Sequence, residues 1–293
     1  MKSEIKKLTF AAVLGLALSG CIENQEVSQQ ESVDEVAMSV ESGLLAISEI
    51  ADDGSGTEAS SKALLESNET DVSAKSVCPQ PAYFQRCDDG KKSVRYDSCQ
   101  PAYALGSLDG FVELNHSQSD CDMSLSGDEV ARTYDLTYTT RGRRKIKVSS
   151  ARHEDYEGNL LGGGGLLTKT STGFEIDVLG KNRKLIGRSG RTLINVSIAT
   201  AESIVVDGSL RRAERTVVSG EILVAHNRAK FTTSLKPNNL VYNEVCCHPI
   251  SGSVDIDFTG SRNGSGTVTF LQCGQAQIDT EQGSRTLNIE NCR

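Results

Sequence analysis

The stretch Ile194-Asn195-Val196-Ser197-Ile198, with Ile204-Val205-Val206 after it, decides the fold class of this chain. β-branched apolar residues occupy every second position, which is the period of a strand with one buried face. The same period recurs from about Val130 to the C-terminus. It is carried by Val130, Tyr134, Leu136 and Tyr138; Phe174, Ile176 and Val178; Ile222 and Val224; Val254, Ile256 and Phe258; Val268 and Phe270; Leu287 and Ile289.

Turn signals separate these apolar runs. They are Asp207-Gly208, Pro237-Asn238-Asn239 and Asn263-Gly264, with Asp89-Gly90 and Asp109-Gly110 as hairpin signals further upstream. No long run beyond residue 78 has a convincing 3.6-residue period, so crossover helices and a parallel sheet are not expected. The pattern predicts an all-β antiparallel meander, as a sandwich or as an open or partly closed barrel.

Composition divides the chain into four parts: 1–20, 21–77, 78–127 and 128–293. Residues 22–77 hold 13 acidic residues, two lysines and no aromatic residue, a net charge of −11, so 78–293 is left at +1. A segment of this composition buries too little apolar area to offset its ordering entropy, and we predict a disordered tether. Residues 78–127 are rich in cysteine and turn residues and form a predicted subdomain before the β domain of 128–293.

One segment of the tether has helical character. Ser32-Val33-Asp34-Glu35 fits a capping box, and apolar residues follow it at helical spacing to Ala51. The sequence therefore predicts a short helix over 33–51, weakened by Gly43. It either docks on the domain or a partner, or forms transiently within the tether.

The first 21 residues have the features of an export signal. Lys2, Lys6 and Lys7 are followed by an apolar run too short to span a bilayer, which ends in Leu18-Ser19-Gly20-Cys21. This ending resembles a bacterial lipobox, and the resemblance implies an acylated Cys21 as the first mature residue. It further implies an exported, membrane-anchored lipoprotein, attached to the outer membrane if the host has two membranes. The alternative is an ordinary signal peptide cut nearby.

The other cysteines form two groups of four. They are Cys78, Cys87, Cys99 and Cys121, and Cys246, Cys247, Cys273 and Cys292. An even number in an exported chain predicts four disulfides, most economically paired within each group. A four-residue hairpin loop at 281–284 would place Cys273 opposite Cys292, which predicts a cross-strand bond between them.

Catalytic and metal motifs are weak. Cys246-Cys247-His248 could be drawn as a zinc site with Cys273, but it lacks the paired spacing of zinc modules, and disulfides are favoured. His153 stands beside Glu154, Asp155 and Glu157, where acid–base chemistry or Ca²⁺ binding is conceivable, although a solvated loop is favoured. The run Gly162–Gly165 fails the phosphate-loop spacing and indicates a bend, a bulge or a flap. We therefore predict no metal and no cofactor.

Basic residues give the clearest candidate surface. Arg141, Arg143, Lys145 and Lys147 alternate along a strand-like run, so they share one face. A second set (Lys181, Arg183, Lys184, Arg188 and Arg191) and a third (Arg211, Arg212 and Arg215) would extend this patch if the strands are neighbours. Its partner would be a phosphorylated glycolipid, an anionic polymer or the acidic tether, unless the patch is only the polar side of a sheet.

Taken together, the sequence predicts a non-enzymatic binding or structural lipoprotein that displays a disulfide-stapled β domain to an envelope or extracellular partner. Nucleic acid is not an expected partner. A carrier or chaperone of lipid or lipoprotein, with an apolar groove beneath a Gly162–Gly165 flap, is the first alternative. A hydrolase that uses His153 is the second.

Overall fold

The structure is a computed structural model that describes residues 39, 40, 43, 82–99, 106–140, 142–209, 211–244, 246, 248–281 and 283–288. The chain splits into two units, Met1–Val40 and Glu41–Arg293, and the β structure belongs to the second. Several predictions lie outside the described residues: the acylated Cys21, the tether apart from three residues, Cys78, Cys247, Cys292 and Arg141. No described helix is long and apolar enough to cross a membrane.

Three residues of the predicted 33–51 helix are described. Ser39 and Val40, in the first unit, are helical and fully buried. Gly43, in the second unit, is also helical and lies against β-sheet residues: a Cβ atom added to it would come within 2.4 Å of Leu235 Cδ1 and 3.9 Å of Ile222 Cδ1. The glycine that weakens the helix is therefore also the residue that permits close approach to the sheet.

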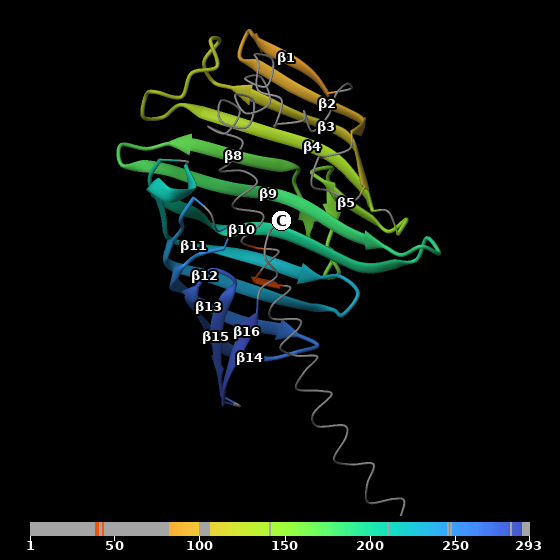
Figure 1. The fold of residues 1–293 in the computed structure, drawn as a ribbon, viewed down its shortest axis with the longest axis vertical. Helices are drawn as coiled ribbons and strands as arrows, with labels where there is room; N and C mark the ends of the chain where they lie inside the picture. Colours follow the sequence, from red (N-terminus) through yellow and green to blue (C-terminus); the bar gives the residue numbers. More distant parts are fainter. Residues whose placement is uncertain are drawn as a thin grey trace, which may run out of the picture. The chain divides into compact units, whose positions relative to one another are not determined.

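The strands follow one another along the chain with short connections (Figure 1). Their bounds are β1 Ala82–Asp88, β2 Lys91–Cys99, β3 Gly106–His116, β4 Glu129–Thr140, β5 Lys145–Ser149, β6 His153–Glu154, β7 Leu160–Leu161, β8 Gly164–Lys169, β9 Gly173–Ile186, β10 Thr192–Gly208, β11 Arg215–His226, β12 Phe231–Val241, β13 Ser251–Gly260, β14 Gly264–Gln272, β15 Gln275–Thr280 and β16 Gly283–Asn288. A 3₁₀ turn, Arg212–Glu214, precedes β11.

Fourteen of these strands form one antiparallel meander sheet, as predicted. Nearly every strand pairs with the next, from β1 at one edge to β16 at the other, while β6 and β7 form a separate two-stranded hairpin. The sheet twists and curls into a partly closed ring, with β13–β16 turned away from the direction of β9–β12 (Figure 1). Of the architectures that the sequence leaves open, the partly closed sheet is the one observed.

The predicted subdomain 78–127 does not stand apart from this sheet. β3 pairs with β4 along its whole length, from Gly106 opposite Thr140 to His116 opposite Val130. The described part of residues 78–127 therefore continues the sheet, and the predicted boundary falls in the β3–β4 connection.

The apolar alternation of β10 defines the buried face. Val196, Ile198, Ile204 and Val206 belong to one strand and are each no more than 1% exposed. The pairing with β9 shifts between Ile198 and Ile204, so that a bulge separates the two apolar sets. The apolar residues of β10 on either side of the bulge are all buried.

Two of the predicted turns are wrong. Asp109-Gly110 lies inside β3, where Gly110 has φ +126° and a Cβ atom would come within 1.9 Å of the Asp135 carbonyl oxygen. Pro237 and the asparagines after it lie inside β12. No residue between Leu235 and Leu240 pairs with β11, so the missing N–H of Pro237 interrupts no ladder on that side.

Two disulfides are described, Cys87–Cys121 and Cys246–Cys273, and each joins cysteines of one predicted group. The predicted Cys273–Cys292 bond is wrong, because Cys273 is bonded to Cys246. The register explains the error: Thr280 pairs with Gly283 and not with Arg285. Gly283 has φ +121°, which allows a tighter hairpin than the four-residue loop assumed from the sequence.

Candidate binding surface

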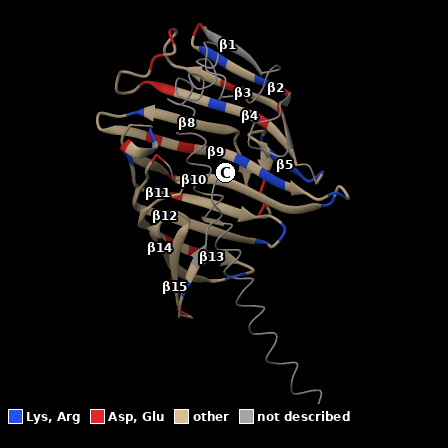
Figure 2. Ribbon diagram, in the orientation of Figure 1, with Lys and Arg blue, Asp and Glu red and all other residues tan. Residues whose placement is uncertain are grey.

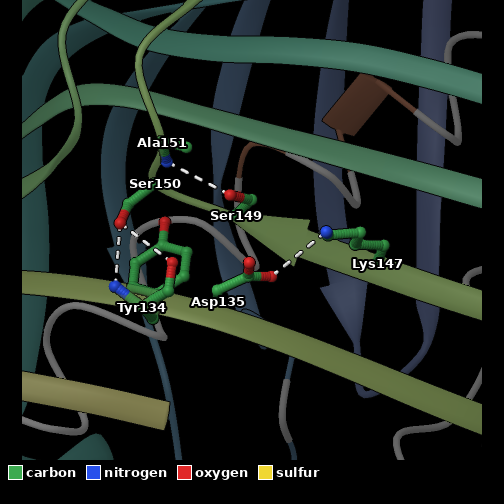
Figure 3. A network of polar contacts seen from close by, with 6 residues as sticks. All are labelled: Tyr134, Asp135, Lys147, Ser149, Ser150 and Ala151. Carbon is green, nitrogen blue, oxygen red and sulfur yellow. Dashed lines mark hydrogen bonds and ion pairs between the residues drawn. The ribbon is translucent and has the colours of Figure 1, made fainter. Parts of the chain in front are cut away.

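The predicted basic residues of the first set lie on or beside β5, in the space between β4 and β9 that is here called the slot. β5 fills one part of this slot and β8 the other, because β5 ends at Ser149. Ser150 closes it: the Tyr134 N–H donates to Ser150 Oγ (2.8 Å), which donates back to the Tyr134 carbonyl oxygen (2.9 Å) (Figure 3). The Ala151 N–H then donates to Ser149 Oγ at 3.1 Å, and the chain leaves the sheet.

The run Gly162–Gly165 enters the same slot from the other side. A Cβ atom on Gly163 would come within 2.1 Å of the Ser150 carbonyl oxygen, and one on Gly164 within 2.1 Å of the Arg132 carbonyl oxygen. Gly164 and Gly165 are buried within β8. The glycines therefore permit close backbone packing inside the sheet, and the predicted flap over an apolar groove is wrong.

Of the predicted alternating cations, Lys145 and Lys147 lie on β5, and Arg143 lies in the β4–β5 turn. Lys147 Nζ is 3.6 Å from Asp135 Oδ1, and both side chains are more than 40% exposed (Figure 3). Lys147 also pairs with Lys184 of β9. Lys145, Lys147 and Lys184 therefore share the polar face of the sheet.

The remaining cations of β9 point the other way. Lys181 pairs with buried Ile198 and is 1% exposed, and Arg183 pairs with buried Val196. Burial, aided by Arg183, lowers the pKa of Lys181 to about 7. The ammonium nitrogen lies 5.9 Å from the centre of the Tyr134 ring. The cations of β9 therefore lie on both faces of the sheet, because successive side chains of a strand point to opposite faces.

The third predicted set lies at the opposite end of the sheet. Arg211 is exposed and forms an ion pair with Glu214 at 3.8 Å. Arg215 is 2% exposed, with its guanidinium carbon 4.9 Å from the centre of the Tyr242 ring. These arginines do not extend the β5 patch.

A larger cluster of cations lies where four turns meet at one end of the sheet. In an antiparallel meander, alternate turns lie at the same end. The turns after β4, β9, β11 and β13 share such an end, and Figure 2 shows basic residues along it. The exposed cations of the first three turns, here called the basic turn row, are Arg143, Arg144, Arg188, Arg191, Arg228 and Lys230. No acidic residue occurs in 142–144, 187–191, 227–230 or 261–263.

Contacts between neighbouring turns join the four side by side. Arg188 lies against Gly142, where an added Cβ atom would be 3.2 Å from its guanidinium. The Arg228 guanidinium donates to the carbonyl oxygens of Thr192 (2.6 Å) and Leu193 (2.7 Å) at the start of β10. The Ser261 N–H donates to the Lys230 carbonyl oxygen at 2.9 Å. The row is therefore one continuous surface.

Sequence reasoning found half of this row and missed Arg144, Arg228 and Lys230. Arg144 and Lys230 directly precede β5 and β12, and Arg228 lies within the β11–β12 turn. The sequence did contain a signal for them. In an antiparallel meander every second turn lies at the same end of the sheet, so the charges of alternate turns can be added to find a basic end.

Carboxylates flank the row on one side. The β6–β7 hairpin, with Glu154, Asp155 and Glu157, is attached to the polar face beside the β11–β12 turn, because the Tyr156 N–H donates to Asn227 Oδ1 at 3.0 Å. Asp155 accepts hydrogen bonds from the backbone of Glu157 and Asn159, and Glu157 accepts one from Tyr156. These carboxylates moderate the positive potential of the row without interrupting it.

His153 makes hydrogen bonds that attach this hairpin to the sheet. Its Nδ1 lies 3.0 Å from the Ala151 carbonyl oxygen and its Nε2 lies 3.0 Å from Ser197 Oγ. Asn227 Nδ2 donates to the same Ser197 oxygen at 2.8 Å, and Ser197 is 1% exposed. The pair holds the hairpin on the sheet, and the carboxylates beside His153 in the sequence do not contact its ring.

The structure also bears on the zinc site that could be drawn at Cys246-Cys247-His248 with Cys273. The sulfur atoms of Cys246 and Cys273 are joined to each other, so neither is available as a thiolate ligand. Among the described residues, no group of three or more histidine, cysteine and acidic side chains is arranged to hold a metal ion.

Fold and surface together define a disulfide-bonded, antiparallel all-β domain with a basic end. Its disulfides are typical of an oxidising compartment outside the cytoplasm. No family model, curated protein or solved structure matches the chain.

Proposed function

We propose that this protein is an exported lipoprotein, anchored through Cys21, whose β domain is a non-enzymatic binding module for an anionic partner in the cell envelope. The observation that supports this most strongly is the basic turn row. Six exposed cations lie on three neighbouring turns without an acidic residue among them, although the chain as a whole carries a net charge of −8.

The arrangement suits display and recognition. The row stands on short turns between strands of a fourteen-stranded sheet, so its cations are held on a rigid support. Recognition of an anionic surface needs fixed positive charge and no nucleophile or general base. Ser197, whose hydroxyl contacts His153, is 1% exposed and therefore out of reach of a substrate, which favours binding over hydrolysis as the function.

Two measurements test this function. Intact-mass analysis of the full chain from membranes should find a diacylglyceryl group on Cys21, and Cys21→Ser should release the protein from the membrane fraction. Retention of the released chain on immobilised dextran sulfate should be lost by about 0.5 M salt, where screening shortens to a few ångströms. An unmodified Cys21 contradicts the anchor, and absence of retention at low salt contradicts the anionic partner.

The lipid-carrier alternative predicts a different result from the same preparation. A lipid bound inside the domain would co-purify in stoichiometric amount with the Cys21→Ser chain, which has no acyl group of its own. A preparation free of lipid favours the display function proposed above.

A further inference from the structure

The shape of the basic turn row fits a flat partner better than a small ligand. Its cations lie on three separate turns along one end of the sheet. A small anion would be recognised by several donors aimed at one point. A row of separate charges instead matches a surface on which anionic groups are spread in a plane, such as the headgroups of a bilayer.

An exposed apolar residue lies beside the row, at the start of β10. Leu193 is 46% exposed, two residues after Arg191, and its carbonyl oxygen accepts a hydrogen bond from Arg228. A large apolar side chain flanked by cations is the composition of a surface that binds at the interface of a membrane, where the cations meet headgroups and the apolar group enters the acyl boundary.

One corner of the opposite end of the sheet is acidic. Asp88, Asp89, Asp120 and Asp122 are exposed in the β1–β2 and β3–β4 connections. These connections are neighbours, because the Gly90 N–H donates to the Ser119 carbonyl oxygen and the Cys87–Cys121 disulfide joins them. A domain with a basic end and an acidic corner turns its basic end toward an anionic plane.

We propose that the basic turn row docks the β domain on anionic phospholipid headgroups of the bilayer that carries its anchor. This inference rests on the proposed function, since acylation of Cys21 supplies the bilayer. The predicted tether would place the domain within reach of the bilayer that carries the anchor. Docking then holds the meander sheet upright, with the acidic corner away from the membrane.

The test uses the full chain with Cys21→Ser, so that no acyl group contributes to binding. Sedimentation with vesicles of phosphatidylcholine, with or without 30% phosphatidylglycerol, measures its partition. We expect binding to the anionic vesicles only, and loss of that binding at 0.5 M salt. Each cation near an anionic surface changes the partition coefficient about fivefold, so Arg143→Gln, Arg144→Gln, Arg188→Gln and Arg191→Gln together should lower it about 100-fold or more. Arg228 is kept because its guanidinium joins two turns.

A matched control removes the same number of charges elsewhere. Lys91, Arg95, Arg211 and Lys236 are exposed and lie outside the row, and their replacement by Gln should change the partition less than about fivefold. Leu193→Ser should weaken binding several-fold without changing its salt dependence. Glu154→Gln, which removes a flanking carboxylate, should strengthen it. Thermal unfolding at the parental temperature verifies that each variant is folded.

The possible outcomes separate the two proposals. Equal binding to neutral and anionic vesicles, or equal losses in the row and control variants, overturns the docking proposal. Retention on dextran sulfate without binding to anionic vesicles overturns the lipid partner and keeps an anionic polymer as partner. Absence of both overturns the proposed function as well.

Discussion

At the scale of single residues, His226 couples stability to pH. Its ring is stacked on Phe231 with centroids 4.2 Å apart and is 4% exposed. Burial, with the charge of Arg262, lowers the pKa of His226 to about 4. The folded state therefore holds the neutral ring, while the unfolded chain begins to bind a proton near pH 6.5. Stability is full above that pH and is lost as pH falls toward 4.

This predicts that the free energy of unfolding falls by about 2 kcal/mol between pH 7 and pH 4.5 through His226 alone. Denaturant titrations of the parent and of His226→Phe, which keeps a ring against Phe231, measure the difference in pH dependence. If the variant loses stability over this range as steeply as the parent does, another group is responsible for the coupling.

Gly164 permits a second prediction at this scale. It has φ +91°, and a Cβ atom would come within 2.1 Å of the Arg132 carbonyl oxygen. Gly158 has a similar φ of +87° with nothing within 4 Å of its Cβ position. Gly164→Ala should therefore lower the free energy of unfolding by at least about 2 kcal/mol more than Gly158→Ala does. Equal losses in the two variants, measured by urea unfolding, would show that the positive φ alone, and not the contact with Arg132, determines the loss of stability.

At the scale of elements, the β6–β7 hairpin is held on the sheet by a few polar contacts. Loss of His153 removes one partner of the buried Ser197 hydroxyl, which also accepts a hydrogen bond from Asn227. We expect His153→Ala to cost about 1–2 kcal/mol of stability, and His153→Ala with Ser197→Ala to cost less than the sum of the single changes. A double-mutant cycle measures this coupling. Strictly additive losses would mean that the two side chains do not interact.

The β3–β4 connection depends on a covalent link. The Cys87–Cys121 disulfide spans 34 residues and ties the β1 edge strand to this connection. Constraint of a loop of this length stabilises by about 3–4 kcal/mol through the unfolded chain. Cys87→Ser with Cys121→Ser should lower the midpoint of thermal unfolding accordingly, as scanning calorimetry would detect. A midpoint that does not move would show that the strands hold this edge without it.

For the individual elements, the sequence predicted the strands well and two of the turns wrongly. The alternation of apolar residues located β4, β9, β10, β11, β13 and β14, because burial of one face requires it. Pro237 and Gly110 misled it, since proline and glycine serve bulges and close approaches within strands as well as turns. The local pattern cannot distinguish these uses, which depend on what the neighbouring strand does.

At the scale of the whole molecule, the disulfide partners and the grouping of surface charges depend on strand register and strand order, which the local sequence pattern does not give. One shift in the β15–β16 pairing changed the predicted partner of Cys273. The basic turn row likewise emerges only when distant turns are brought to one end. Its individual cations were visible in the sequence, but their adjacency follows from the order of strands in the sheet.

The same strand order predicts how the sheet opens. β10 pairs with β9 on one side and β11 on the other, and its residues Val196, Ile198, Ile204 and Val206 are buried, whereas β16 lies at the edge of the described sheet beside β15. Backbone amides of Val196–Ile198 should therefore exchange with solvent only through global unfolding, and those of β16 through local fraying. Hydrogen exchange followed by mass spectrometry should show protection that falls from β10 toward β16. Reduction of the Cys246–Cys273 disulfide should steepen this gradient, because it releases the β14–β15 turn. Uniform protection along the meander would mean that the sheet opens as one cooperative unit from edge to edge.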